Sequence, residues 1–260
     1  MGQPCDALAC FLLDNARPSA GGDGAMTGCD GAVREKPEET AREGFKNRAR
    51  ATTAMRFSFT RQERYDLLRS WLLVSLAFAF FMTGIGFDMT HLVLLVFALV
   101  TALVTVGIGF LFHELSHKWL ANRYGCHAEY KADSLMLLIS LVISVFGVFI
   151  AAPGAVHISG HADQEQNGKI SLAGPAANIV LALAFMALFF LLPNIVFSRA
   201  AGLGAIINSS LALFNLIPVG IFDGAKVLAW NKAAYGAAVG AAVLLTFLSF
   251  VLIQTGLGLF

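Results

Sequence analysis

The chain has 260 residues, of which 57% are hydrophobic and only 13% are charged, whereas soluble globular domains carry about 25% charged residues. This composition excludes a soluble globular domain. The charges concentrate early: 11 of the 18 Lys and Arg residues and 10 of the 17 Asp and Glu residues lie within residues 1–70. The rest of the chain is therefore expected to be a membrane domain, and because the net charge of +1 provides no basic face, no nucleic-acid partner is expected.

The first 54 residues differ from everything that follows. They are polar and rich in Gly, Ala and charged residues, which predicts a disordered N-terminal tail. Met55 begins a basic, amphipathic segment of the kind that precedes a first membrane helix, so Met55 is an alternative start of the protein. The membrane domain is expected to cover residues 55–260.

Apolar segments long enough to approach a membrane crossing follow this tail, since a spanning helix needs about 20 apolar residues. Basic residues between positions 56 and 69 place the start of the first segment on the cytoplasmic side. The candidate segments are Trp71–Phe87, Leu92–Phe112, Ser134–Ala152, Ala176–Leu192, Ala200–Ile217 and Gly236–Phe260.

The inner end of the second segment carries the motif HELSH, with His113, Glu114 and His117. Residues four apart lie on one face of a helix, so both imidazoles can bind one metal ion while Glu114 lies beside a metal-bound water. This is the arrangement of zinc peptidases. A chance match or a role in helix packing is the competing interpretation, but ionisable residues within a membrane span are costly and indicate function.

A catalytic zinc needs a third protein ligand. Asp163 and Glu165 lie in a polar stretch that predicts a solvated loop, whereas Asp223 ends an apolar run that is broken by Pro218 and Gly220. Such a broken helix can expose side chains to a polar cavity inside the bilayer. Asp223 is therefore the candidate ligand, with a helix cap as its alternative role.

Two other polar features lie near these candidate ligands in the sequence. Asn215 precedes Asp223 by eight residues, and its amide can donate to a substrate carbonyl or oxyanion, or form a hydrogen bond between helices. His157 and His161 are also four residues apart, but Pro153 and Gly160 argue against a helix there. No metal pair is expected at these two histidines.

The number of crossings bears on whether the ligands can meet. If all six segments crossed, Asp223 would lie about 30 Å from the HELSH motif, on the opposite side of the bilayer. Ser134–Ala152 is therefore predicted to be re-entrant, because Pro153 and Gly154 end a helix and residues 155–158 predict a short strand. The fold class that follows is an all-α polytopic membrane protein with about five spanning helices and a re-entrant helix and β-strand element.

With HELSH on an early span, NLIPVGIFDG on a late one, and GKISLAGPAANIVLAL between them, the chain resembles the site-2 protease family of intramembrane zinc metalloproteases. The resemblance covers about residues 65–232 and includes the family's Gly-Pro-x-x-Asn element, here Gly174, Pro175 and Asn178. The sequence departs from the family at Ile221 and Ala225, where many members have Pro and Gly.

What the resemblance implies can be stated residue by residue. His113, His117 and Asp223 would bind one Zn²⁺ ion per chain, Glu114 would be the general base, and Asn215 would assist at the substrate. A strand-like element would lie between the HELSH helix and Gly174.

The function expected from the residues and the resemblance together is a zinc-dependent intramembrane endopeptidase. It would be a multi-pass protein of the cell membrane with its active site towards the cytoplasm, and its partners would be the lipid bilayer and a membrane-embedded protein substrate. The alternatives are another membrane zinc peptidase, whose third ligand is usually a downstream Glu, or a noncatalytic metal-binding transporter or scaffold. No Glu follows Glu165 in this chain.

Overall fold

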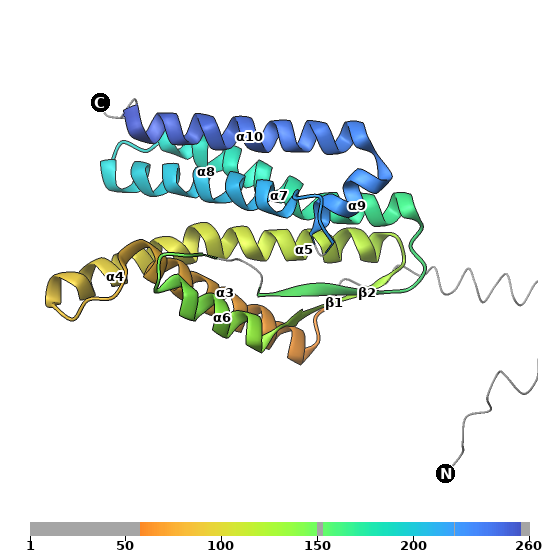
Figure 1. Ribbon diagram of the computed structural model, residues 1–260, viewed down its shortest axis with the longest axis horizontal. Coiled ribbons are helices and arrows are strands. Elements are labelled where there is room, and N and C mark those ends of the chain that lie inside the picture. Colours follow the sequence, from red (N-terminus) through yellow and green to blue (C-terminus); the bar gives the residue numbers. More distant parts are fainter. Residues whose placement is uncertain (1–57, 150–152, 221, 256–260) are drawn as a thin grey trace, which may run out of the picture. The chain divides into compact units, whose positions relative to one another are not determined.

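The computed structural model describes residues 58–149, 153–220 and 222–255 (Figure 1). The predicted disordered tail at residues 1–54, the alternative start at Met55, and the departure at Ile221 lie outside these residues.

Five helical runs among the described residues are long and apolar enough to cross a membrane. The second run is continuous through an α-helix, one π-helical turn and a second α-helix. This finding confirms the prediction of an all-α membrane protein with about five spanning helices. The runs are α3 (Arg61–Thr83), α4 with η1 and α5 (Met89–Ala102, Leu103–Gly107 and Ile108–Arg123), α7 (Gln164–Leu191), α8 (Ile195–Asn215) and α10 (Lys232–Thr255).

All five runs begin earlier than their apolar segments predict, and α3 and α7 do so by ten residues or more. α3 begins at Arg61 because the Thr60 side chain caps it by accepting a hydrogen bond from the backbone N–H of Glu63 at 3.0 Å. α7 begins at Gln164, where Asp163 and Gln166 form a capping box. The prediction of a loop at Glu165 is therefore wrong, since this exposed residue lies in the first turn of α7.

The predicted re-entrant segment contains a short helix, α6 (Ser134–Ser144). Its 11 residues rise only about 16 Å, about half the thickness of the hydrocarbon core. The chain then returns as β2 (Gly154–Ser159), which confirms the predicted strand. β2 pairs in antiparallel fashion with β1 (His127–Ala132), a strand that the sequence did not predict.

The helix that carries HELSH, α5, packs between α7 and the strand pair. α5 contacts α7 and both strands, and α7 contacts α8 and the short helix α9 (Asp223–Trp230). The two strands, α9 and the C-terminal end of α5 lie at the same end of the helices, whereas the connections from α3 to α4 and from α7 to α8 lie at the other end (Figure 1). The chain thus returns Asp223 to the end that carries HELSH.

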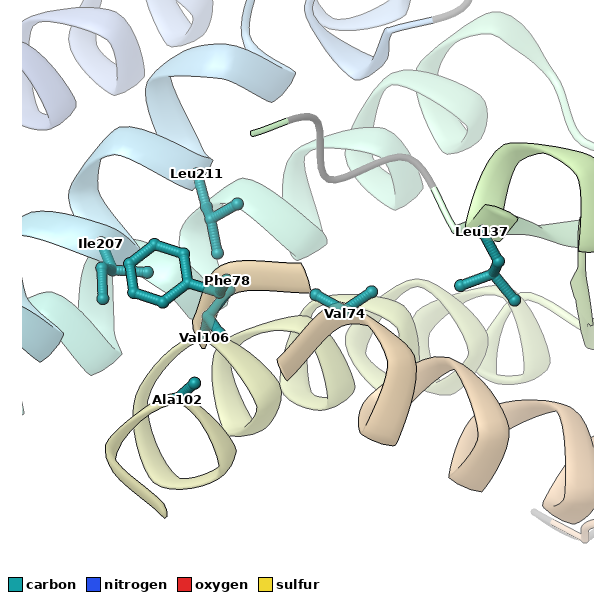
Figure 2. Packing of buried hydrophobic residues seen from close by; sticks show 7 residues of the cluster. All are labelled: Val74, Phe78, Ala102, Val106, Leu137, Ile207 and Leu211. Atoms are coloured by element: carbon teal, nitrogen blue, oxygen red, sulfur yellow. The ribbon is translucent and has the colours of Figure 1, made fainter. Parts of the chain in front are cut away.

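A buried apolar cluster joins the early helices to α6 and α8. Figure 2 shows that side chains from α3, α4, η1 and α8 converge, with one residue of α6 beside them. The cluster consists of Val74, Phe78, Ala102, Val106, Leu137, Ile207 and Leu211.

Large apolar side chains also cover the outward faces of several helices. Examples are Phe97 on α4, Leu183 on α7 and Phe247 on α10, which are 50–63% exposed. Water-exposed surfaces seldom carry apolar patches this extensive, so these faces are suited to contact with lipid. Together with the five apolar helices, they make the chain a multi-pass membrane protein.

Candidate metal centre

The HELSH motif lies in α5, the helix that directly follows the π-helical turn η1. The indole N–H of Trp71 on α3 donates to the backbone carbonyl of Leu103 in this turn, at 3.2 Å. α3 therefore braces the helix about three turns before the motif. His113, Glu114 and His117 are all buried in the packed side of α5.

Three predicted ligands converge at this point. The Nε2 atoms of His113 and His117 lie 3.0 Å apart, and Oδ2 of Asp223 lies 3.4 Å from the first and 3.1 Å from the second. Among the described residues, this is the group of His, Cys, Asp and Glu side chains whose ligand atoms are close enough to share a metal ion. The other histidine pair, His157 and His161, is not in it.

The triangle fits zinc. Ligand atoms about 2.0–2.1 Å from a tetrahedral Zn²⁺ ion are about 3.3–3.4 Å apart, close to the 3.0–3.4 Å found here. Two His nitrogens and one carboxylate oxygen are also a donor set that catalytic zinc sites use, with a fourth position left for water or substrate.

The backbone of α7 orients one imidazole and leaves room for an ion. Nδ1 of His117 lies 2.7 Å from the carbonyl oxygen of Ile170, so Nδ1–H donates and Nε2 is free to bind a metal. Nδ1 of His113 has no hydrogen-bond partner in the described part of the chain. A Cβ atom on Gly174 would lie 2.3 Å from Nε2 of His117 and 2.6 Å from Nε2 of His113. Gly174 therefore keeps open the position that a shared metal would take.

Asp223 reaches the histidines because α9 begins beside the end of α8. At the next residue, Gly224, a Cβ atom would lie 2.1 Å from the carbonyl oxygen of Leu216, so only glycine permits this approach. Burial by itself raises the pKa of the Asp223 carboxyl, but the neighbouring His117 and His113 outweigh it and hold the pKa below its usual range. The ionised carboxylate is the form that binds a metal.

Glu114 lines a cavity of about 550 Å³ together with His113. The first residues of β2 and the polar residues around Asp133 line the same cavity. The backbone amide of Val156 in β2 faces the Glu114 carboxylate. Glu114 does not belong to the group of three residues whose ligand atoms could share a metal ion. Its carboxylate is therefore available for proton transfer.

Two carboxamides also line this cavity. Nδ2 of Asn215 donates to the carbonyl oxygen of Leu211 at 3.0 Å, within its own helix. Asn178, which is 1% exposed, has a buried Oδ1 with no partner among the described residues. The sequence analysis named Asn178 only as part of the Gly-Pro-x-x-Asn element and did not predict it as a site residue. That element is the sequence feature from which its place in the cavity could have been predicted. It lies within α7, about ten residues after the helix begins.

Comparison with known proteins gives concordant matches. Residues 101–202 match the family model of peptidase family M50. A protein of Methanocaldococcus jannaschii named "Putative zinc metalloprotease MJ0611" is 38% identical over 178 residues, which cover 67% of this chain and 87% of that protein. No solved structure shows a significant match.

Two mycobacterial proteins are also similar. "Putative zinc metalloprotease Rip2" of Mycolicibacterium smegmatis is 33% identical over 43% of this chain and 49% of its own length. "Putative zinc metalloprotease Rip3" of Mycobacterium tuberculosis is 32% identical over 57% of this chain and 36% of its own length. The matched regions therefore cover half or less of each of these two relatives. The resemblance read from HELSH and NLIPVGIFDG is thereby confirmed: the chain belongs to peptidase family M50, the family of the site-2 proteases.

Proposed function

We propose that the chain is a zinc-dependent intramembrane endopeptidase that hydrolyses a peptide bond in or near a transmembrane segment of a substrate protein. The observation that carries this proposal is the triangle of His113, His117 and Asp223, which lies beside Glu114 at the wall of the cavity. One zinc ion per chain would be held by these three side chains.

The residues around the triangle supply the rest of the chemistry. When bound, zinc would activate a water molecule and polarise the substrate carbonyl. Glu114 would take a proton from that water and deliver it to the leaving amine. Asn215 lines the same cavity, and its second amide hydrogen would donate to the substrate carbonyl oxygen as negative charge develops there.

The distribution of basic residues supports a site that faces the cytoplasm. Lys118 and Arg123 lie at the C-terminal end of α5, Lys226 lies in α9, and Lys232 is the first residue of α10. The C-terminal end of α5, α9 and the start of α10 lie at the end of the helices that carries HELSH (Figure 1). Because Lys and Arg are enriched in cytoplasmic flanks, this end would lie in the cytoplasm.

The hydrogen bonding of a membrane helix indicates the form in which a substrate would be cleaved. A membrane helix satisfies its backbone carbonyls internally, so the scissile bond becomes accessible only where that helix unwinds. We therefore expect substrates with helix-breaking residues near the cleavage site. The surrounding bilayer and a membrane-embedded protein would be the partners of this chain.

The test is cleavage after reconstitution of the purified protein in liposomes. The substrates would be single-span reporters whose membrane helix carries a Gly-Pro pair near the cytoplasmic end, and the matched control would carry Leu-Leu there. Cleavage of the first reporter, its loss with a chelator and its return with Zn²⁺ would support the proposal. Cleavage that persists in Glu114→Gln protein would contradict it, as would reporters that remain intact while zinc is bound.

A further inference from the structure

A buried ion pair lies behind the HELSH motif. The Lys118 ammonium, on the residue that follows His117, pairs with Oε2 of Glu63 on α3. Lys118 is 2% exposed and Glu63 is 1% exposed. Taking two charges out of water is expensive, and replacing such a pair with apolar residues of similar volume is often neutral for stability or favourable. Stabilisation of the fold therefore does not by itself explain this buried pair, and another role is expected.

The second oxygen of Glu63 indicates that role. Oε1 accepts a hydrogen bond from the backbone N–H of Tyr130 in β1, at 3.0 Å. One carboxylate thus joins α5 to β1. The phenol of Tyr130 fixes the same point of the strand, because its hydroxyl donates to Oγ of Ser70 at 2.9 Å and its ring packs edge-on against Phe110. Burial raises the pKa of this hydroxyl, so it remains a donor.

The strand register connects this contact to the active site. Tyr130 pairs with Val156 across the two strands. The N–H of Tyr130 points to Glu63, away from β2, and the amide of Val156 faces Glu114 on the other side. Outward-pointing amides on both strands are the pattern of a pair that does not exchange hydrogen bonds. The carboxylates of Glu63 and Glu114 therefore bracket this pair from its two outer edges.

The bracket closes through α5 itself. Glu114 and Lys118 are four residues apart, so they lie on the same face of the helix. A continuous set of contacts therefore links the two ends of this face. Glu114 faces the Val156 amide, and Val156 pairs with Tyr130 across the strands. The Tyr130 N–H donates to Glu63, and Glu63 pairs with Lys118. Because β1 and β2 are paired, a displacement of β1 would also move β2 relative to Glu114. It would change the shape of the cavity that β2 and Glu114 line.

We propose that Glu63, supported by Lys118, is a positioning residue that holds the strand pair against the HELSH helix and so sets the distance between β2 and Glu114. The part of this inference that concerns turnover rests on the proposed peptidase function. The part that concerns the position of the strands does not.

Two double variants separate the hydrogen bond from the ion pair. Glu63→Gln with Lys118→Met removes both charges but keeps an oxygen that can accept from the Tyr130 N–H. Glu63→Leu with Lys118→Met also removes both charges and offers no acceptor. The two proteins differ only at residue 63, so burial of charge is the same in both and their folding and zinc content are expected to match.

Hydrogen–deuterium exchange of the Tyr130 amide in the purified full-length protein is the first measurement. Its exchange in the Leu variant is expected to be about five- to tenfold faster than in the Gln variant, the equivalent of one lost hydrogen bond, with faster exchange also in residues 154–159. Equal exchange in the two variants would overturn the proposal. So would loss of zinc or of the folded state in both, because the pair would then serve the fold as a whole.

Turnover of a cleaved reporter is the second measurement. Because small displacements from catalytic geometry cost about 10–100-fold in rate, kcat of the Leu variant is expected to fall by that factor relative to the Gln variant, with KM within about threefold. Equal kcat values would overturn the positioning role. If the unmodified protein cleaves no reporter, the proposed function fails, while the exchange experiment still decides whether Glu63 holds the strands.

Discussion

Gly174→Ala is predicted to remove zinc from the site without unfolding the protein. The added Cβ would lie 2.3 Å and 2.6 Å from the Nε2 atoms of His117 and His113. A shared zinc would lie about 2.0–2.1 Å from the same two atoms. The methyl group would therefore occupy space that the ion needs, at contacts about an ångström inside the usual distance of about 3.5 Å.

The size of the effect follows from comparing metal binding with folding. Loss of an outer partner of a metal ligand costs about 10–100-fold in affinity, and a methyl group in space that the ion needs should cost at least about 100-fold. For folding, Ala gains about 1 kcal/mol over Gly in a helix, and overpacking costs about 1–3 kcal/mol. The net change in the free energy of unfolding is therefore expected to lie within about 2 kcal/mol.

Zinc content by mass spectrometry and thermal unfolding of the detergent-solubilised protein measure these two quantities. Gly236→Ala is the matched control, because a Cβ at this exposed position of α10 meets nothing within 4 Å. The control should keep its zinc and be slightly more stable. A Gly174→Ala protein that still binds one zinc per chain with unchanged affinity would refute the inference that α7 leaves room for the ion at this glycine.

The remaining predictions concern the other site residues, the orientation and the tail. Glu114→Gln should keep zinc and lose about 10²–10⁴-fold in kcat, the contribution of a general base, whereas Asp223→Ala should lose zinc as well; an Asp223→Ala protein with full zinc content and activity would remove Asp223 from the site. Asn215→Ala should lower kcat by about 10²–10³-fold at unchanged zinc content, as for a lost oxyanion donor, and an unaltered kcat would assign Asn215 to helix structure. In a protein without other cysteines, single cysteines at positions 163 and 228 should both react with an impermeant thiol reagent from the cytoplasmic side, and reaction of position 163 only from outside would mean that residues 134–152 cross the membrane. Deletion of residues 1–54 should leave insertion and zinc content unchanged, and a truncated protein that fails to insert would show that the tail has a function.

The residues of the candidate site were predictable because chemistry limits them strongly in a membrane domain. HELSH places two histidines and a carboxylate on one helix within an apolar run, and few other acidic residues remain further along the chain. Asp223 then follows by elimination and from the broken helix that precedes it. The structure brings the two imidazoles and the Asp223 carboxylate to within 3.4 Å of one another.

Helix boundaries and β1 were less predictable because apolar windows do not detect them. α7 extends through ten residues before Gly174, QEQNGKISLA, most of which are polar or small. The capping box at Asp163 satisfies the start of this stretch. β1 reads HAEYKA and mixes charged, aromatic and small residues. It forms a strand because β2 pairs with it and Glu63 occupies its outer edge, and both of these partners are distant in sequence.

The same distant contacts explain how the short helix and strand of the re-entrant element can approach the candidate metal centre. A strand edge in the hydrocarbon region leaves backbone groups unsatisfied, which is tolerated only where protein or a water-filled cavity covers them. Here the Tyr130 amide is satisfied by Glu63, the Val156 amide faces Glu114, and the first residues of β2 border the cavity. The side chain proposed as the general base therefore also covers part of the strand edge. A substitution that changes the length of Glu114, such as Glu114→Asp, would then disturb both β2 and proton transfer. Glu114→Gln keeps the length of the side chain and an acceptor oxygen, so it would affect proton transfer alone.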